Sequence, residues 1–217
     1  MLIKNIMHNS QQYFLWILLI IIVIILFCAI RMYWSQQTGT DLTDQQSSMS
    51  YRCKRGQQLW DDHFYLTRLY IVSAMRNGSG TNATAQRLLL NQDQLGQLYN
   101  STQLGTLLQE HINIAVLITN SVLQNKGIPN PTYLNQWKEN ANQIGILISQ
   151  LTGLSVPEAQ AMMQNHLNLT AAELLAEYQC STGNSNACVT SVNNGDLALQ
   201  QIREMSDHLC GLQTMCN

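Results

Sequence analysis

Apolar residues run without interruption in one segment near the start of the chain. From Tyr13 to Ile30 the sequence has eighteen residues and no charge among them. At about 1.5 Å per helical residue this stretch spans roughly 27 Å, close to the thickness of a bilayer core. Aromatic rings flank it on both sides, and a basic residue follows it. The pattern predicts a transmembrane helix over residues 13–34 with interfacial anchors at Tyr13, Trp16, Arg31 and Trp34.

A cleaved signal peptide is the main alternative for this segment. Its apolar core is longer than that of most signal peptides, and bulky residues occupy positions 31–34, where cleavage would fall. We therefore expect a retained anchor after a short N-terminal tail, residues 1–12. The charges that flank the segment favour an N-terminal tail on the inside only weakly, so the orientation stays open.

The next segment, residues 35–50, contains almost nothing apolar and is predicted to be a flexible spacer. Residues 51–217 then show helical periodicity, with apolar residues recurring every three or four positions. Helices are predicted over about 59–75, 101–125, 133–151 and 196–212, with a short helix around 88–90. Two capping boxes, Ser155 to Glu158 and Thr170 to Glu173, predict further helix starts. The expected fold is all-α: an antiparallel bundle of four or five main helices behind one transmembrane helix.

Composition narrows the function. Charged residues make up 11% of the chain and the formal net charge is −2, which argues against nucleic-acid binding because that needs a basic surface. Amide side chains take the place of the missing charged ones. They are suitable for a surface in contact with other proteins. A compositional bias of the genome is the alternative explanation. None of the common motifs for nucleophilic, phosphate-binding, dinucleotide-binding or zinc-hydrolase chemistry is present. We predict no catalytic residues, no cofactor and no small-molecule substrate.

The histidines are the one constellation that could carry chemistry. Four of them fall on four predicted helical segments: His63, His111, His166 and His208. If all four converged they could bind a transition metal in the bundle core. No Glu-x-x-His pair is present, and a polar core network is the commoner role of such residues. We predict no metal site and keep these four as weak candidates. Two tryptophans, Trp60 and Trp137, are expected in the core rather than in a recognition surface with Arg68.

Cysteine spacing suggests disulfides in the C-terminal part. Cys180 and Cys188 bracket a small polar loop, and Cys210 and Cys216 bracket the end of the last helix. Both local pairs are possible, as are crossed pairs such as Cys188 with Cys210. Cys53 is left over, either free or as a link to another chain. At least one bridge is expected, which implies an oxidising compartment or a virus-encoded oxidase.

Several short stretches resemble a known family. They are Leu59 to His63 with Thr67 and Arg68, Arg87 to Gly96, Glu110 to Ala115, Trp137 to Ile144, and His166 to Thr170. In this order and spacing, over residues 57–178, the chain is similar to an uncharacterised all-helical family of Gram-positive bacteria with relatives in large icosahedral DNA viruses. The resemblance implies an all-helical fold and no particular reaction. The added membrane segment, the many amides and the cysteine-bearing C-terminal part look like a viral version, by analogy.

The leading hypothesis is therefore structural. We expect a single-pass membrane protein of the virion, a minor capsid protein whose partners are the lipid bilayer and other capsid or membrane proteins. The alternatives are a ligand-binding or receptor-like ectodomain and a metal-binding helical-bundle enzyme.

Overall fold

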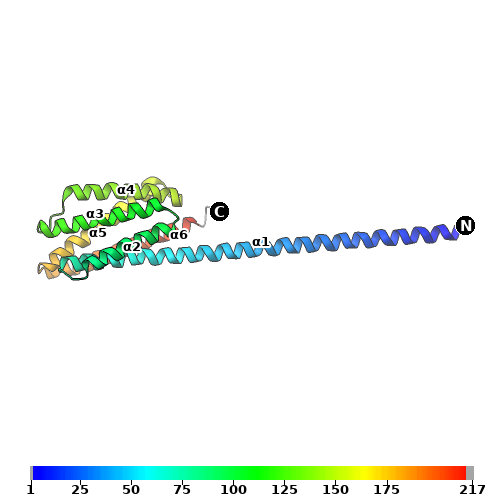
Figure 1. The fold of residues 1–217 in the computed structure, drawn as a ribbon, viewed down its shortest axis with the longest axis horizontal. Coiled ribbons are helices and arrows are strands. Elements are labelled where there is room, and N and C mark those ends of the chain that lie inside the picture. The colour runs from blue at the N-terminus through cyan, green and yellow to red at the C-terminus, as the bar shows by residue number, and fades with distance from the viewer. Residues whose placement is uncertain (1, 214–217) are drawn as a thin grey trace. The chain divides into compact units, whose positions relative to one another are not determined.

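The computed structural model describes the backbone of residues 2–213 and the side chains of residues 19, 21–33 and 50–210. Every element in this part of the chain is a helix, which confirms the predicted all-α class. The helices are α1 (Leu2–Met75), α2 (Thr81–Leu98), α3 (Thr102–Gln124), α4 (Pro131–Thr152), α5 (Val156–Ser181) and α6 (Ser185–Gln213) (Figure 1). The chain divides into two compact units, Met1–Ser50 and Tyr51–Asn217, and α1 contributes to both.

In the first unit the backbone of α1 is helical throughout. This includes residues 35–50, which the sequence predicts as a spacer. The segment contains no proline and a single glycine, so no residue in it stops a helix firmly. The helical backbone therefore differs from the expected flexible spacer.

The predicted transmembrane segment stays a prediction. Among the residues whose side chains are described, no helix offers a stretch long and apolar enough to cross a bilayer. Tyr13, Trp16 and Trp34 lie outside those residues. Arg31 is described, and its guanidinium carbon lies 5.8 Å from the centre of the Phe27 ring.

The second unit is a helical bundle in which consecutive helices pack against each other. From α2 to α6 each helix contacts the next one in the chain, and α5 also contacts α3. The end of α1 runs antiparallel to α6, because Cys53 is bonded to Cys210 and Asp61 is paired with Arg203. The bundle thus contains the last part of α1 and five further helices, more than the four or five main helices predicted.

Side chains at the helix starts explain why the elements begin where they do. The Ser101 hydroxyl accepts a hydrogen bond from the Leu104 N–H, and the Asn130 side chain caps α4, whose first residue is Pro131. The predicted capping box at Ser155 and Glu158 is confirmed, with both of its reciprocal hydrogen bonds present.

The second predicted capping box is wrong. Thr170 lies inside α5, and its hydroxyl donates 2.9 Å to the carbonyl oxygen of His166, one turn earlier in the same helix. A threonine that bonds back to the preceding turn leaves the helix intact, so α5 continues to Ser181. The last helix accordingly begins at Ser185 instead of 196, and the short helix predicted around 88–90 is the middle of α2.

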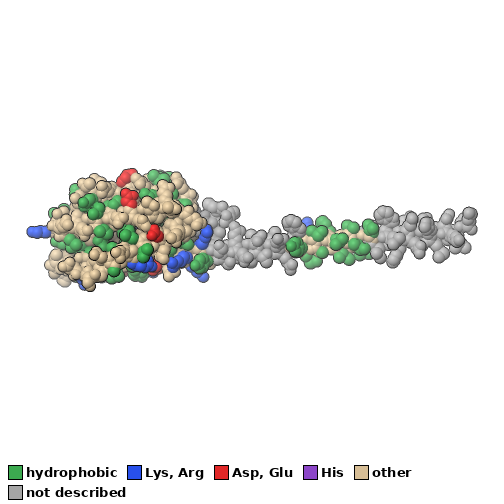
Figure 2. Space-filling model, in the orientation of Figure 1, with side chains coloured by type: hydrophobic (Ala, Val, Ile, Leu, Met, Phe, Trp, Pro, Cys, Tyr) green, Lys and Arg blue, Asp and Glu red, His purple; other side chains and the backbone are tan. Residues whose placement is uncertain are grey.

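The core of the second unit is apolar and closely packed. Leu59, Leu95, Ile144 and Ile202 are among its fully buried side chains. At the turn between α2 and α3 the backbones touch, since a Cβ on Gly96 would lie 2.8 Å from the Cα of Gly105. On the face that Figure 2 shows, hydrophobic side chains are scattered among polar ones, and few charges are visible.

Candidate functional site

Three of the four candidate histidines meet in the centre of the bundle. His63 on α1, His111 on α3 and His166 on α5 are all buried, with at most 5% of each residue exposed. The ring centres of His63 and His166 are 5.7 Å apart, and those of His166 and His111 are 6.1 Å apart. His208 is exposed on α6 and does not join them. We call His63, His111 and His166 the histidine triad.

A tryptophan lies at each end of the triad. The Trp60 ring is 5.7 Å from His63, and the Trp137 ring is 5.0 Å from His111. Both tryptophans are buried, so the prediction that they belong to the core is confirmed. The two indole rings therefore border the two outer imidazoles.

Neutral amides determine the tautomers of the outer histidines. The Nδ1 atom of His111 lies 2.9 Å from Asn140 Oδ1, which can only accept, so Nδ1 carries the proton. The Nδ1 atom of His63 lies 3.1 Å from Gln92 Nε2, which donates, so the proton of His63 is on Nε2. Asn140 and Gln92 are oriented by further bonds to the carbonyl oxygens of Leu107 and Leu88.

The central histidine is the least satisfied of the three. His166 Nδ1 and Gln201 Oε1 are both buried, and the weak polar contact between these two side chains opposes the fall in the pKa of His166. Gln201 instead donates through Nε2 to the carbonyl oxygen of Met162. Trp137 Nε1 and Gln92 Oε1 are also buried without partners. Such orphaned polar atoms cost free energy in a core, and four of them belong to His166, Gln201, Trp137 and Gln92, in or beside the triad.

Burial keeps the triad neutral. Desolvation, helped by the nearby His166 and His111, holds the pKa of His63 well below its usual value. Desolvation and the neighbouring His166 lower the pKa of His111 to about 3, although the Asn140 hydrogen bond opposes this. Desolvation lowers the pKa of His166 to about 4. All three are uncharged imidazoles at neutral pH.

The geometry offers little to a metal ion. Among the described residues no group of three or more histidine, cysteine, aspartate or glutamate side chains is arranged to hold one. The rings of His111 and His166 are stacked at 29° with their centres 6.1 Å apart, and the Nδ1 atoms of His63 and His111 are each engaged by an amide side chain. Of the acidic neighbours in sequence, Asp62 is 3.9 Å from Arg87, and the exposed Glu110 lies 3.4 Å from the side-chain nitrogen of Asn140.

A second polar cluster, in which two glutamates are buried and two arginines are partly exposed, links α1 to α5 and α6. Arg68 Nη1 lies 2.6 Å from Glu173 Oε1, and Arg76 pairs with Glu177 at 2.9 Å. The Ser191 hydroxyl donates 2.8 Å to the second oxygen of Glu177. Desolvation raises the pKa of Glu173 to about 7 against the opposing effect of Arg68. Sequence reasoning missed these pairs, because each joins residues about a hundred positions apart.

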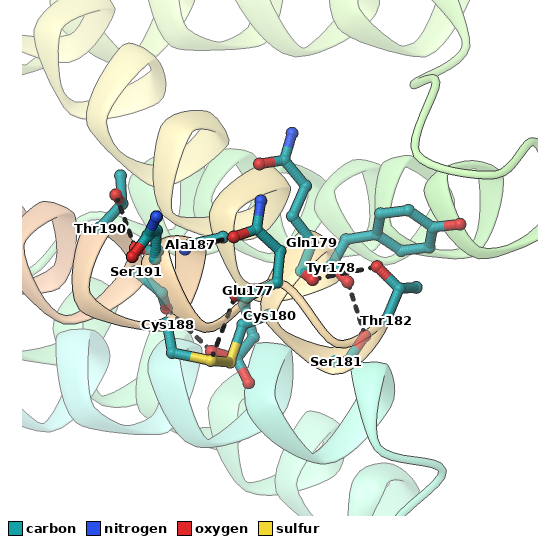
Figure 3. Close-up of a disulfide and its surroundings, with 12 residues drawn as sticks. Glu177, Tyr178, Gln179, Cys180, Ser181, Thr182, Ala187, Cys188, Thr190 and Ser191 are labelled. Atoms are coloured by element: carbon teal, nitrogen blue, oxygen red, sulfur yellow. Dashed lines mark hydrogen bonds between the residues drawn. A yellow bond between two sulfur atoms is a disulfide. The ribbon is translucent and has the colours of Figure 1, made fainter.

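Two disulfides hold the C-terminal part of the bundle. Cys180 and Cys188 form the predicted local pair across the turn between α5 and α6 (Figure 3). Cys210 is bonded to Cys53, so the expectation that Cys53 is left over is wrong. The pairing follows from the antiparallel packing of α1 and α6, which spacing alone does not show. Cys216, the expected local partner of Cys210, lies outside the described residues.

No family model, curated protein or solved structure matches this chain. The resemblance to an uncharacterised helical family therefore stays a prediction.

Proposed function

We propose that this chain is a structural, membrane-anchored protein whose helical domain binds other proteins beside a bilayer. Following the resemblance, we propose the setting of a virion, in which a minor capsid protein links an internal membrane to the capsid shell. No catalytic role, cofactor or small-molecule substrate is part of this proposal.

The observation that supports the anchor most is the exposure of apolar side chains in the first unit. Ile21, Ile22, Val23, Ile24 and Ile25 are each 48–60% exposed, although all are strongly apolar. Hydrophobic side chains dominate the coloured stretch of this unit in Figure 2. Burying a side chain of this size contributes roughly 1.5–3 kcal/mol, so a contiguous set of them provides a strong drive into lipid.

Extraction of membranes tests the anchor. The full chain should stay in the pellet after alkaline carbonate treatment and enter solution only with detergent. Ile21→Lys combined with Ile25→Lys should release it, because each lysine costs about 2.5–3.5 kcal/mol near the centre of a bilayer. The matched control places two lysines on exposed positions of the bundle, Gln86 and Asn113, and should remain in the pellet. Release of the unmodified chain by carbonate alone would contradict the anchor.

The capsid setting is tested separately by composition of purified particles. The chain should be found there by mass spectrometry, cross-linked to shell proteins through its exposed lysines. If it is present in cellular membranes and missing from particles, the virion part of the proposal is wrong and the anchor stands.

One observation favours a receptor-like ectodomain as the second candidate. All four asparagines in glycosylation sequons are exposed: Asn77, Asn82, Asn100 and Asn168. If glycosidase treatment of the chain from eukaryotic cells shifts its mobility, the domain lies on the lumenal side and this candidate replaces the virion role. An unshifted band supports the first proposal.

A further inference from the structure

The histidine triad lies where three helices meet and has no counter-charge beside it. We propose that it is an acid trigger, in which protonation of His63, His111 and His166 opens the bundle in mildly acidic solution and separates α2, α3 and α4 from α1, α5 and α6. This role goes beyond membrane anchoring and does not depend on it.

The polar partners of the three imidazoles are neutral amides. Each outer histidine is bonded to a neutral amide, and the central one has only another amide, Gln201, beside it. A proton added to any ring would therefore lie about 6 Å from a second imidazole and be stabilised by no carboxylate. Placing an uncompensated charge in a core is strongly unfavourable.

The carboxylates on the helices packed around the triad are turned to other partners or to solvent. Asp62 is paired with Arg87, Asp93 with Gln109, and Glu173 with Arg68. Glu110 is exposed and reaches only Asn140, at 3.4 Å. The remaining charged side chains of α4 and α6 near this level are exposed, namely Lys138, Glu139, Glu204 and Asp207. The charge interactions on His63 come from His166 and His111, and the one on His111 comes from His166.

Covalent and ionic links decide which part opens. Cys53–Cys210 ties α1 to α6, and Cys180–Cys188 ties α5 to α6. The ion pairs Arg68–Glu173 and Arg76–Glu177 join α1 to α5, whereas one exposed ion pair, Asp62–Arg87, joins α1 to α2. No disulfide among the described residues reaches α2, α3 or α4. Repulsion between His111 on α3 and the two histidines on α1 and α5 therefore acts across a boundary that neither of these disulfides crosses.

The difference in bound protons between the unfolded and folded states sets the sign and size of the pH dependence of unfolding. The folded pKa of each triad histidine is lowered below its unfolded value of about 6.5, so each favours the fold above that pH and loses its contribution as pH falls. Glu173 acts in the opposite direction, because its folded pKa of about 7 lies above its unfolded value. Near pH 5.5 the three histidines bind about three protons in the unfolded state and almost none in the folded state. Glu173 does the reverse, because it binds about one proton in the folded state and almost none in the unfolded state. The net uptake is about two protons.

The test measures that uptake directly. Full-length protein in neutral detergent micelles is unfolded with urea at a series of pH values between 6 and 5, following the near-ultraviolet circular dichroism of its aromatic residues. The equilibrium constant for unfolding should rise about a hundred-fold for each unit of pH decrease. His166→Gln should reduce this to about ten-fold. His208→Gln changes an exposed histidine and should leave it at a hundred-fold.

A second measurement covers the case in which His166→Gln does not fold. In the unmodified folded protein, the imidazole NMR signals of the triad should show no protonation down to pH 5. Triad signals that titrate near pH 6.5 in the folded state would overturn the proposal. An unfolding constant that is independent of pH, or equally dependent in the His166 and His208 variants, would overturn it as well.

Discussion

The disulfide Cys53–Cys210 should be the strongest single constraint on the helical domain. It joins residues 157 positions apart, whereas Cys180–Cys188 joins residues 8 apart. A cross-link stabilises a fold by removing freedom from the unfolded chain, and the effect grows with the logarithm of the loop length. On that relation the long loop contributes about 5 kcal/mol and the short loop about 2.5 kcal/mol.

The comparison therefore needs two double variants. Cys53→Ser with Cys210→Ser opens the long loop, and Cys180→Ser with Cys188→Ser is the matched control. Urea unfolding of the full chain in detergent micelles, without reductant, gives the free energy of unfolding of each. The first variant should lose about 2.5 kcal/mol more than the second.

Two outcomes would refute this reasoning. Equal losses in the two variants would mean that the long-range bridge does not constrain the unfolded chain. Peptide mapping without reduction that links Cys210 to any cysteine other than Cys53 would remove the bridge itself. The second result would also remove the covalent tie between α1 and α6.

Three further predictions follow from individual contacts. Gly195→Ala should destabilise the domain by about 2 kcal/mol, because a Cβ there would lie 1.8 Å from Arg68 Nη1 and would push this side chain off the buried Glu173 carboxylate, whereas Gly80→Ala meets no atom within 4 Å and should change the urea midpoint little. Ser155→Ala should cost about 1 kcal/mol in thermal unfolding by removing the cap of α5. The folded pKa of Glu173 is raised, so this carboxyl favours the fold at low pH and loses its contribution as pH rises through about 7. From pH 6 to pH 8, Glu173→Gln should therefore gain about 1 kcal/mol of stability relative to the unmodified protein, measured by urea unfolding at both values.

The local sequence predicted the helices well where a cap or a breaker marked their ends. Ser101, Asn130 and Ser155 each cap a helix close to the predicted start, because a side-chain oxygen next to an apolar repeat is a local signal. The same signal was misleading at Thr170, where the hydroxyl bonds within the helix. Only the packing of α5 against its neighbours separates the two cases.

The candidate site was predicted in part for a similar reason. The candidates were His63, His111, His166 and His208, because each falls on a separate predicted helical segment. The structure buries the first three and leaves His208 exposed. Helical spacing gives the face of a residue on its own helix and says nothing about which faces of different helices meet. The pairing of Arg68 with Glu173 and of Cys53 with Cys210 depends on that second kind of information, so neither could be read from the sequence.

The helices of the domain are not all held together by the same kinds of link. The end of α1 is held to α6 by a disulfide and to α5 by two ion pairs with buried glutamates, while α2, α3 and α4 are held by packing, amide hydrogen bonds and the exposed ion pair Asp62–Arg87. If α1 continues into a membrane anchor, a pull on the anchor is borne by the three linked helices. The remaining helices are then free to separate without breaking that connection. The proposed acid trigger would keep α1 connected to α5 and α6 while α2, α3 and α4 separate.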